Sequence, residues 1–338
     1  MRLLLAVLLA AGSASAQSWS VQTTGIDSNL RGVSVTRTSG SSPVPIIWAC
    51  GSHGVILRSV DAGKTWMRLR VPGADALDFR SVQAFGAQTA YVMSIGSGPQ
   101  SRIYKTADGG KTWTLQYVGR RSAVFLDDLV CISKNTCYAL SDPVDGRFLL
   151  IRTRDGLHWH PLRRDRMPPA LAGEGVFAAS GTSLLIQRGE IYFATGGASV
   201  ARVFRSHDLG QSWAAVATPV ASTNSSSGIF SLGGNGESLI IVGGDYKIPA
   251  KTINTSAYSS DDGATWRLAA TPLGGFRSGI VFLNGTTALA VGPSGEDISS
   301  DAGVHWTSVG SLNLNAVAVF DSHRAWGVGP KGTIARYR

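Results

Sequence analysis

Six short segments of the chain repeat the same pattern, in which a Ser or Thr is followed by Asp two residues later, then by Gly and finally by Trp. The first copy reads Ser59-Val60-Asp61-Ala62-Gly63-Lys64-Thr65-Trp66, and the third copy, which ends at Trp159, is one residue shorter. The aspartates of the six copies are 47, 47, 53, 53 and 40 residues apart. They are Asp61, Asp108, Asp155, Asp208, Asp261 and Asp301. Units of this length that carry several short strands are typical of β-propeller blades, so the repeat predicts an all-β propeller.

The residue types of this repeat suit a tight turn between two strands. The Asp carboxylate and the Ser or Thr hydroxyl can accept hydrogen bonds from backbone N–H groups of the turn. Gly supplies a positive φ, and Trp offers a large apolar surface to the neighbouring unit. The pattern resembles the Asp-box, or BNR repeat, of sialidases and many other propellers. We therefore interpret the six aspartates as structural; the alternative is a set of catalytic or metal-binding carboxylates.

The first sixteen residues have the organisation of a secretory signal peptide. Arg2 supplies a positive charge, residues 3–11 are an apolar run too short to span a bilayer, and Ala14-Ser15-Ala16 forms a small-residue cleavage site. We therefore expect a signal peptide over residues 1–16 and a single soluble, exported domain over residues 17–338. No later segment of the sequence is long and apolar enough to predict a membrane helix.

The ends of the chain indicate how the propeller closes. After the last repeat, residues 316–320, 325–328 and 333–337 form three further strand-like segments. Trp19–Gln22, near the other end, resembles the strand that follows a repeat. We therefore expect seven blades, the last of which pairs Trp19–Gln22 with Thr333–Tyr337 and leaves no free sheet edge at the closure. The alternative is six blades with an unclosed terminal hairpin.

The three cysteines fit an exported protein. Cys131 and Cys137 flank a hairpin connection, so a disulfide across two strands is expected there, while Cys50 is expected to be free in an inner strand. The alternative is three buried thiols.

The chain carries a formal net charge of +9 at pH 7. A basic surface favours an anionic partner, such as an acidic protein, a polysaccharide or a membrane surface, and nucleic acid is not expected as the partner of an exported chain. Several arginines fall in the expected connections between blades, namely Arg120, Arg121, Arg163, Arg164 and Arg166. The alternative is that these charges serve only solubility.

A set of polar side chains is expected near the axis of the ring. When the starts of the seven inner strands are aligned, with Gly173–Val176 as the fourth and Phe276–Gly279 as the sixth, one column contains Arg31, Arg80, Asp127, Glu174, Ser227, Arg277 and Asn315. Loops expected on the same face add His53, Asp142, Asp145, Asp245, Tyr246, Lys247 and Lys331. Because arginine binds carboxylates and phosphates through paired hydrogen bonds, the arc of Arg31, Arg80 and Arg277 suits an anionic group. The alternative is a set of ion pairs that only tie the inner strands together.

Signals for cofactors and metals are weak. The sequence contains no Gly-x-Gly-x-x-Gly, P-loop, Gly-x-Ser-x-Gly or Cys-x-x-Cys pattern. Asp142–Gly146 lacks the further oxygen ligands of a calcium loop, so we interpret it as a turn. His158 and His160 fit a solvent-exposed strand face better than a metal site. We therefore expect no cofactor and no metal.

Longer phrases of the sequence resemble a known family. Cys50–Ser59 and Ala325–Ile334 are similar to segments of the photosystem II stability/assembly factor family, and the resemblance covers nearly all of residues 19–338. It implies a seven-bladed Asp-box propeller, exported to the lumenal side of the thylakoid, that acts as a non-catalytic assembly chaperone. Leu140–Gly146 and Gly173–Ser180 further resemble a bacterial branch that is often labelled oxidoreductase or glycosyl hydrolase.

The sialidase superfamily is a more distant resemblance and supplies the enzymatic alternative. Sialidases use an arginine triad, a Tyr–Glu nucleophile pair and an Asp acid. The candidates for these roles are Arg31, Arg80 and Arg277 for the triad, Tyr246 and Glu174 for the pair, and Asp142 or Asp145 for the acid. The Arg-Ile-Pro phrase that sialidases place before their first Asp-box is absent from this sequence.

We therefore favour a non-catalytic, monomeric binding module over a glycoside hydrolase. The expected partner is an exported or membrane protein with an acidic segment, or a carboxylate-bearing glycan, which docks on the face that carries the long loops. The expected location is the periplasm, the thylakoid lumen or the extracellular space.

Overall fold

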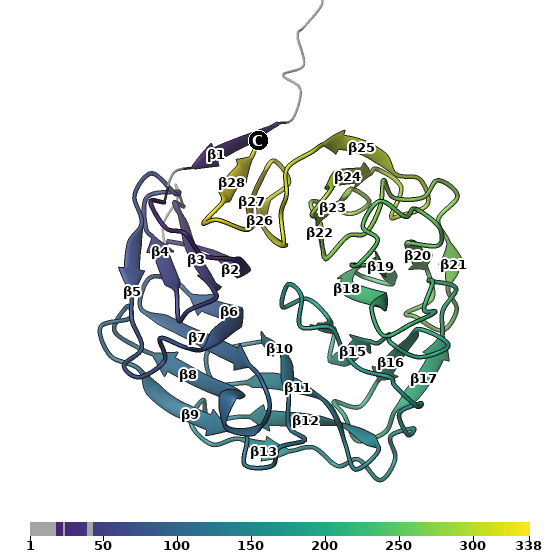
Figure 1. Ribbon diagram of the computed structural model, residues 1–338, viewed down its shortest axis with the longest axis horizontal. Helices are drawn as coiled ribbons and strands as arrows, with labels where there is room; N and C mark the ends of the chain where they lie inside the picture. Colours follow the sequence, from purple (N-terminus) through teal and green to yellow (C-terminus); the bar gives the residue numbers. More distant parts are fainter. Residues whose placement is uncertain (1–17, 23, 39–42) are drawn as a thin grey trace, which may run out of the picture.

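The computed structural model describes residues 18–22, 24–38 and 43–338, and the expected signal peptide lies outside these residues. The described chain folds into seven antiparallel sheets of four strands each, arranged as blades around a central axis (Figure 1). A short 3₁₀ helix, η1 (Gly98–Gln100), is the one helical element among the described residues. The prediction of an all-β, seven-bladed propeller is confirmed.

Each blade runs from an inner strand at the axis to an outer strand at the rim. Blades 1 to 3 contain β2 (Leu30–Arg37), β3 (Pro45–Gly51), β4 (Ile56–Ser59) and β5 (Met67–Leu69); β6 (Asp78–Phe85), β7 (Thr89–Ile95), β8 (Arg102–Thr106) and β9 (Thr114–Val118); and β10 (Leu126–Cys131), β11 (Cys137–Val144), β12 (Arg147–Thr153) and β13 (His160–Pro161). Blades 4 and 5 contain β14 (Leu184–Gln187), β15 (Glu190–Ala194), β16 (Arg202–Ser206) and β17 (Ala214–Ala217); and β18 (Ser227–Asn235), β19 (Ser238–Asp245), β20 (Ser256–Ser259) and β21 (Arg267–Leu268). Blades 6 and 7 contain β22 (Gly279–Phe282), β23 (Ala288–Gly292), β24 (Gly295–Ser299) and β25 (Thr307–Gly310); and β26 (Ala316–Asp321), β27 (Arg324–Val328), β28 (Ile334–Tyr337) and β1 (Trp19–Gln22).

The two ends of the chain close the ring, as the sequence predicted. β1 pairs with β28 in antiparallel register, with Trp19 opposite Tyr337 and Gln22 opposite Ile334. The rings of Trp19 and Tyr337 lie 5.2 Å apart between centroids. Blade 7 therefore takes its outer strand from the start of the chain, and the six-blade alternative is wrong.

The Asp-boxes form the turns between the third and fourth strands of their blades. In the first box, Asp61 Oδ1 accepts hydrogen bonds from the Thr65 backbone N–H (2.9 Å) and the Ser59 hydroxyl (2.7 Å). Gly63 has a φ of 82° and donates its N–H to the Ser59 hydroxyl. The box tryptophans pack between blades, since Trp113 contacts Trp48 of blade 1 and Trp159 contacts Tyr91 of blade 2. All these contacts are short-range or lie at blade interfaces, which accounts for the regular repeat.

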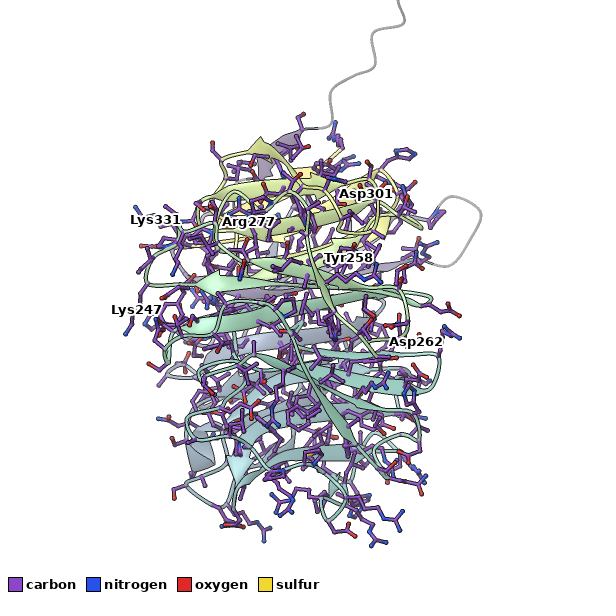
Figure 2. The ribbon with its side chains drawn as sticks, turned by 90° about the vertical axis from the view of Figure 1, so that its right-hand side faces the viewer. Lys247, Tyr258, Asp262, Arg277, Asp301 and Lys331 are labelled. Carbon is purple, nitrogen blue, oxygen red and sulfur yellow. A yellow bond between two sulfur atoms is a disulfide. The ribbon has the colours of Figure 1, made fainter. Side chains whose placement is uncertain are left out.

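The propeller has two distinct faces, which Figure 2 shows edge-on. Lys247, which follows β19, and Lys331, which precedes β28, lie on one side of the disc, and the box-turn residues Asp262 and Asp301 lie on the other (Figure 2). We call the side with Lys247 and Lys331 the loop face. It also carries the long connection between β13 and β14 and the loop between β19 and β20.

The cysteines are arranged as the sequence predicted. Cys131 and Cys137 lie directly opposite each other in β10 and β11, and their sulfur atoms form a disulfide. Cys50 is a free thiol buried in β3.

Candidate functional site

A cavity of about 460 Å³ lies at the axis of the propeller, on the loop face. We call it the central cavity. Its walls come from the starts of the inner strands and from loops between the second and third strands. They are formed by Arg31, Arg80, Phe177, Ala178, Ala179, Phe230, Tyr246, Phe276, Ser278, Pro293 and Asn315.

One wall of the central cavity is basic, because β-bulges direct two arginines toward it. The register of β2 against β3 shifts between Leu30 and Gly32, and that of β6 against β7 shifts between Phe79 and Ser81. A bulge leaves its extra residue outside the ladder and turns that side chain away from the sheet face. The extra residues are Arg31 and Arg80.

The two guanidinium groups keep part of their hydrogen-bonding capacity. Arg31 Nη1 donates to Asn315 Oδ1 (3.1 Å), while Arg80 donates from Nη2 to Asp78 Oδ2 (2.7 Å) and from Nη1 to the Ala178 carbonyl oxygen (2.9 Å). The Nε atoms of Arg31 and Arg80 are buried and have no hydrogen-bond partner in the described part of the chain. Burial, followed by the positive charge of Arg80, lowers the pKa of Arg31 to about 10, so Arg31 remains charged at neutral pH. An anion placed here would gain from both charges.

The opposite wall is aromatic. The rings of Phe177 and Phe230 are stacked, with centroids 3.9 Å apart, and the ring of Phe276 meets Phe230 edge-on at 4.6 Å. Tyr246, which is 48% exposed, lies beyond them with its ring centroid 6.1 Å from that of Phe230. The cavity therefore combines a cationic wall with an apolar aromatic wall.

Phe177 reaches this wall because blade 4 lacks the first part of a regular inner strand. Gly175 forms an isolated bridge with Gly196, and β14 begins only at Leu184. The intervening segment, residues 176–183, extends toward the axis, where the Ala178 carbonyl accepts the hydrogen bond from Arg80 of blade 2 (Figure 1). The expected start of this inner strand at Gly173–Val176 is therefore wrong.

Arg277 does not share the cavity wall with Arg31 and Arg80. In blades 1 and 2 the arginine comes directly before the residue that pairs with the second strand, namely Gly32 with Cys50 and Ser81 with Met93. In blade 6 the corresponding pair is Gly279 with Val291. The residue in the position of Arg31 and Arg80 is therefore Ser278. Arg277 is only 1% exposed, and its Nε bonds to Asp297 Oδ2 at 2.6 Å. Its Nη1 donates to the Ser294 hydroxyl (3.0 Å) and to the Phe276 carbonyl. The side chain is thus held in a buried ion pair within blade 6.

The column position was also misassigned in blade 5. There the register shifts between Ile229 and Ser231, so Phe230, not Ser227, is the bulge residue. Ser227 is buried and its hydroxyl accepts hydrogen bonds from the Thr223 and Asn224 backbone N–H groups.

Most of the predicted acids are engaged in local structure. The carboxylate of Glu174 is buried and accepts hydrogen bonds from Arg202 and from the Thr195 hydroxyl. Asp245 accepts hydrogen bonds from Asn224 Nδ2 (3.0 Å) and the Ser226 hydroxyl (2.7 Å). In the described part of the chain, Glu174 and Tyr246 share no hydrogen bond, although the sialidase hypothesis pairs them.

Asp127, Asp142 and Asp128 form a buried acidic group in blade 3. Burial, followed by the charges of Asp142 and Asp128, raises the pKa of Asp127 well above its usual range, and burial raises the pKa of Asp128 and of Asp142 to about 6. Asp142 Oδ1 accepts a hydrogen bond from the Val176 N–H at 2.9 Å, which ties blade 3 to blade 4. Asp145, by contrast, is exposed and forms a paired contact with Arg121, with both N–O distances at 2.7 Å.

The aromatic wall is the part of the site that sequence reasoning missed. Phe177, Phe230 and Phe276 each lie next to a small or apolar residue in the sequence, where a phenylalanine is normally interpreted as part of the hydrophobic core. Phe230 could have indicated the aromatic wall. It is the bulge residue of its inner strand, and the bulge residues of blades 1 and 2 are arginines.

These observations define an Asp-box propeller with a basic and aromatic cavity on its loop face. The sequence model of the photosynthesis system II assembly factor YCF48 matches residues 9–298. The chain belongs to this family. No curated protein matches the sequence.

Solved structures show the same fold. A structure described as YCF48 bound to D1 peptide is 15% identical, with a TM-score of 0.65 over 94% of this chain and 96% of that chain. YCF48 from Cyanidioschyzon merolae is 16% identical, with a TM-score of 0.64 over 95% of this chain and 98% of that chain. The WD40 β-propeller domain of Doa1 is 12% identical, with a TM-score of 0.57 over 95% and 97% of the two chains. At these identities the likeness concerns the fold alone.

Two further observations concern membranes and metals. None of the described residues belongs to a helix long and apolar enough to cross a membrane. Within residues 18–22, 24–38 and 43–338, no group of three or more His, Cys, Asp or Glu side chains is arranged to hold a metal ion.

Proposed function

We propose that the chain is a non-catalytic binding module that docks an acidic or carboxylate-bearing segment of another protein on its loop face. The supporting observation is the composition of the central cavity, in which Arg31 and Arg80 face a wall of Phe177, Phe230 and Phe276. A carboxylate would take hydrogen bonds from the two guanidinium groups, and an apolar side chain next to it would pack on the aromatic rings. Binding of a D1 peptide by a relative of the same fold supports a polypeptide as the ligand.

The proposal includes the cellular setting. We infer that residues 1–16 direct export, that the mature domain is a monomer in the periplasm, the thylakoid lumen or the extracellular space, and that its partner is an exported or membrane protein. Arg120 and the other arginines between blades would raise the rate of encounter with an acidic partner through their long-range field.

A glycoside hydrolase fits the site less well. The carboxylate of Glu174 is buried with Arg202, and Arg277 is buried with Asp297, so two of the three groups that a sialidase-like mechanism requires lack access to a ligand. A catalytic carboxylate or arginine must be able to reach the reacting atoms of the substrate, and neither of these side chains can do so.

The test measures binding of a defined probe by fluorescence anisotropy. The probe is a fluorescein-labelled hexapeptide that ends in Asp-Phe with a free carboxylate, and the comparison peptide has Asn-Phe with a C-terminal amide. The Arg31→Ala, Arg80→Ala double variant is expected to bind the acidic peptide at least about tenfold more weakly, because two charge-assisted contacts are lost. Arg267→Ala, an exposed arginine on the outer strand of blade 5, is the matched control and is expected to bind like the wild type.

Two results would contradict the proposal. The first is equal affinity of wild type and double variant for the acidic peptide, when both show the same thermal midpoint. The second is turnover of a fluorogenic sialoside that is abolished by Tyr246→Phe, which would establish an enzyme instead.

A further inference from the structure

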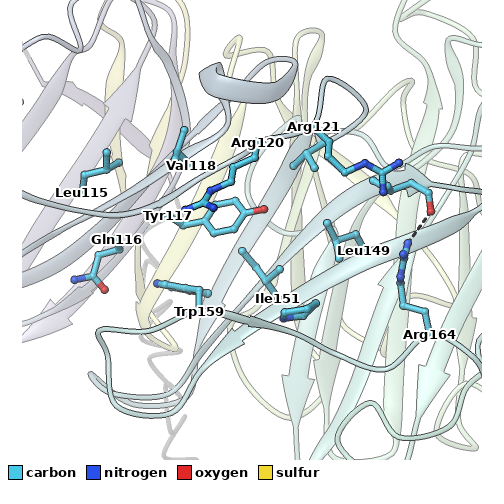
Figure 3. Close-up of a pocket in the computed structure, with 13 residues that line it drawn as sticks. Leu115, Gln116, Tyr117, Val118, Arg120, Arg121, Leu149, Ile151, Trp159 and Arg164 are labelled. Atoms are coloured by element: carbon cyan, nitrogen blue, oxygen red, sulfur yellow. Dashed lines mark hydrogen bonds between the residues drawn. The ribbon is translucent and has the colours of Figure 1, made fainter.

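A second recess lies at the rim, between blades 2 and 3, and is separate from the central cavity. It has a volume of about 600 Å³ and shares no lining residue with the central cavity. Leu115 and Tyr117 of β9 form one side, and Leu149 and Ile151 of β12, together with Trp159 and Pro161, form the other (Figure 3). We call it the rim groove.

The rim groove exists because the outer strand of blade 3 is short. β12 has seven residues, but β13 has two and pairs only with Ile151 and Arg152. One more backbone bond, from the Leu162 N–H to the Leu150 carbonyl, follows before the chain continues into the connection to blade 4. Among the described residues no strand therefore lies on the outer side of β12 from Arg147 to Leu149, where the Arg147 carbonyl instead accepts a hydrogen bond from Arg164. In blade 2, by contrast, β9 pairs with four of the five residues of β8.

The consequence is an exposed apolar surface where a propeller usually has a fourth strand. Leu149 is half-buried at the base of the groove, and Leu115 is 49% exposed on the facing strand. Alternate residues of an extended chain point to the same side. Two side chains of a bound strand, two residues apart in that strand, would therefore cover both leucines. The groove thus fits a strand-like segment better than a helix.

The charges of the groove favour an acidic occupant. None of its described lining residues is Asp or Glu, whereas Arg120, Arg121 and Arg164 line it. In Figure 3 Arg120 extends toward Tyr117, and Arg121 and Arg164 lie on the other side of Leu149. Arg121 is neutralised by Asp145. Arg164 Nη1 bonds only to backbone carbonyls, those of Val144 (2.6 Å) and Arg147 (3.2 Å), and exposed Arg120 forms no ion pair with any described residue. The three arginines share one nearby carboxylate, that of Asp145, so two positive charges along the groove are in excess.

We propose that the rim groove binds an extended segment of a partner polypeptide. The segment carries apolar side chains at alternate positions, which pack on Leu115, Leu149 and Trp159, and acidic side chains that meet Arg120 and Arg164. It lies between β9 and β12, on the side chains that the short outer strand of blade 3 leaves uncovered. This site is independent of the central cavity and gives the propeller a second contact.

The experiment uses the full mature chain and a defined peptide. The probe is a fluorescein-labelled decapeptide of alternating Leu and Thr with two Asp residues at each end. Asp residues at both ends allow the peptide to bind in either strand direction. The comparison peptide has Lys in place of each Asp. Anisotropy is expected to show binding of the acidic peptide at low salt with a Kd of about 10–100 μM, and at least tenfold weaker binding of the Lys peptide. Arg120→Glu and Leu115→Ser are each expected to weaken the acidic peptide about tenfold. The matched controls on the outer strand of blade 5, Arg267→Glu and Leu268→Ser, are expected to change its affinity less than twofold.

Several outcomes would overturn the proposal. These are no binding up to about 1 mM peptide, equal binding of the acidic and basic peptides, and equal affinity of the groove variants and their controls. Loss of binding in the Arg31→Ala, Arg80→Ala variant but not in Arg120→Glu would assign the peptide to the central cavity. A dimer in sedimentation equilibrium that Leu115→Ser dissociates would show that a second copy of this chain fills the groove.

Discussion

Arginines that look alike in this sequence have different tasks, and their environments separate them. Arg277 and Asp297 are each 1% exposed and are paired at 2.6 Å, whereas Arg80 lies at a cavity wall with 17% of its side chain exposed. Removal of one partner of a buried pair leaves an uncompensated charge and typically costs about 3–5 kcal/mol. We therefore expect Arg277→Ala to lower the free energy of unfolding by about this amount, and Arg31→Ala to lower it by about 1 kcal/mol or less.

Urea denaturation followed by tryptophan fluorescence measures both values. The double variant Arg277→Ala, Asp297→Asn is the control and is expected to recover part of the loss, because it removes the unpaired charge. Equal losses for Arg277→Ala and Arg31→Ala would show that the buried pair has no special role in stability.

The two copies of the tripeptide Phe-Arg-Ser show the limit of sequence reasoning at this scale. Phe79-Arg80-Ser81 and Phe276-Arg277-Ser278 are identical in letters, but Arg80 is a bulge residue within the pairing of β6, whereas the pairing of β22 begins only after Ser278, at Gly279. The hairpins that follow differ, since Phe85 pairs with Thr89 in one and Phe282 with Ala288 in the other. Turn length and bulge position set the register, and neither is visible in the tripeptide. The Asp-box was predictable because its bonds join residues at most four positions apart.

At the scale of elements, β1 is the strand whose role is easiest to test. It pairs with β28 through four residue pairs, and Trp19 lies against Tyr337 and over Gly327. Deletion of residues 18–22 would leave the edge of β28 unpaired and the site of Trp19 empty. We expect a loss of about 3–5 kcal/mol in unfolding free energy, comparable to removal of a large core side chain.

Thermal unfolding by circular dichroism is the measurement, and Trp19→Ala is expected to account for more than half of the shift in midpoint. An unchanged midpoint in the deletion variant would contradict closure of the ring by β1.

Closure was predictable from the sequence, whereas the course of blade 4 was not. The missing seventh Asp-box indicated that one blade is divided between the termini, and the pairing of β1 with β28 confirms this arrangement over the six-blade alternative. In blade 4, residues 176–183 leave the sheet for the axis, where they are held by Arg80 of blade 2 and by the stacking of Phe177 on Phe230 of blade 5. These contacts join residues far apart in the sequence, so the alignment of the inner-strand starts placed the start of this strand wrongly at Gly173–Val176.

At the scale of the whole molecule, the aspartates of the Asp-box turns and the buried aspartates near the axis have opposite pKa shifts. Carboxylates of the Asp-boxes are stabilised as anions by turn hydrogen bonds: the Thr112 hydroxyl lowers the pKa of Asp108 to about 2, and the Thr265 hydroxyl does the same for Asp261. Near the axis, burial instead raises the pKa of Asp128 and of Asp142 to about 6. Stability should therefore respond to pH in two separate windows.

The direction of each response follows from proton linkage. An Asp-box carboxylate binds its proton less tightly in the folded state than at its ordinary pKa of about 3.9, so its stabilisation is complete above pH ~4 and is lost as the pH falls toward ~2. Asp128 and Asp142 bind their protons more tightly in the folded state, so they make stability decrease as the pH rises from ~4 to ~6. Buried Asp127, whose pKa is also raised, adds to this decrease. We expect the urea midpoint to be highest near pH ~4–5 and lower at both pH ~2.5 and pH ~7.5.

Two variants test which residues cause the change in stability in each of the two pH ranges. Asp142→Asn removes one of the buried acids while the amide oxygen keeps the bond from the Val176 N–H, so the decrease between pH ~4.5 and pH ~7.5 should shrink by on the order of 2 kcal/mol. Asp261→Asn should leave that decrease unchanged and reduce the loss on the acidic side, because the Thr265 contacts no longer depend on an ionised group. A urea midpoint that rises steadily from pH ~2.5 to pH ~7.5 in the wild type would contradict raised pKa values in the buried acids, since those acids oppose the gain from the Asp-boxes as the pH increases.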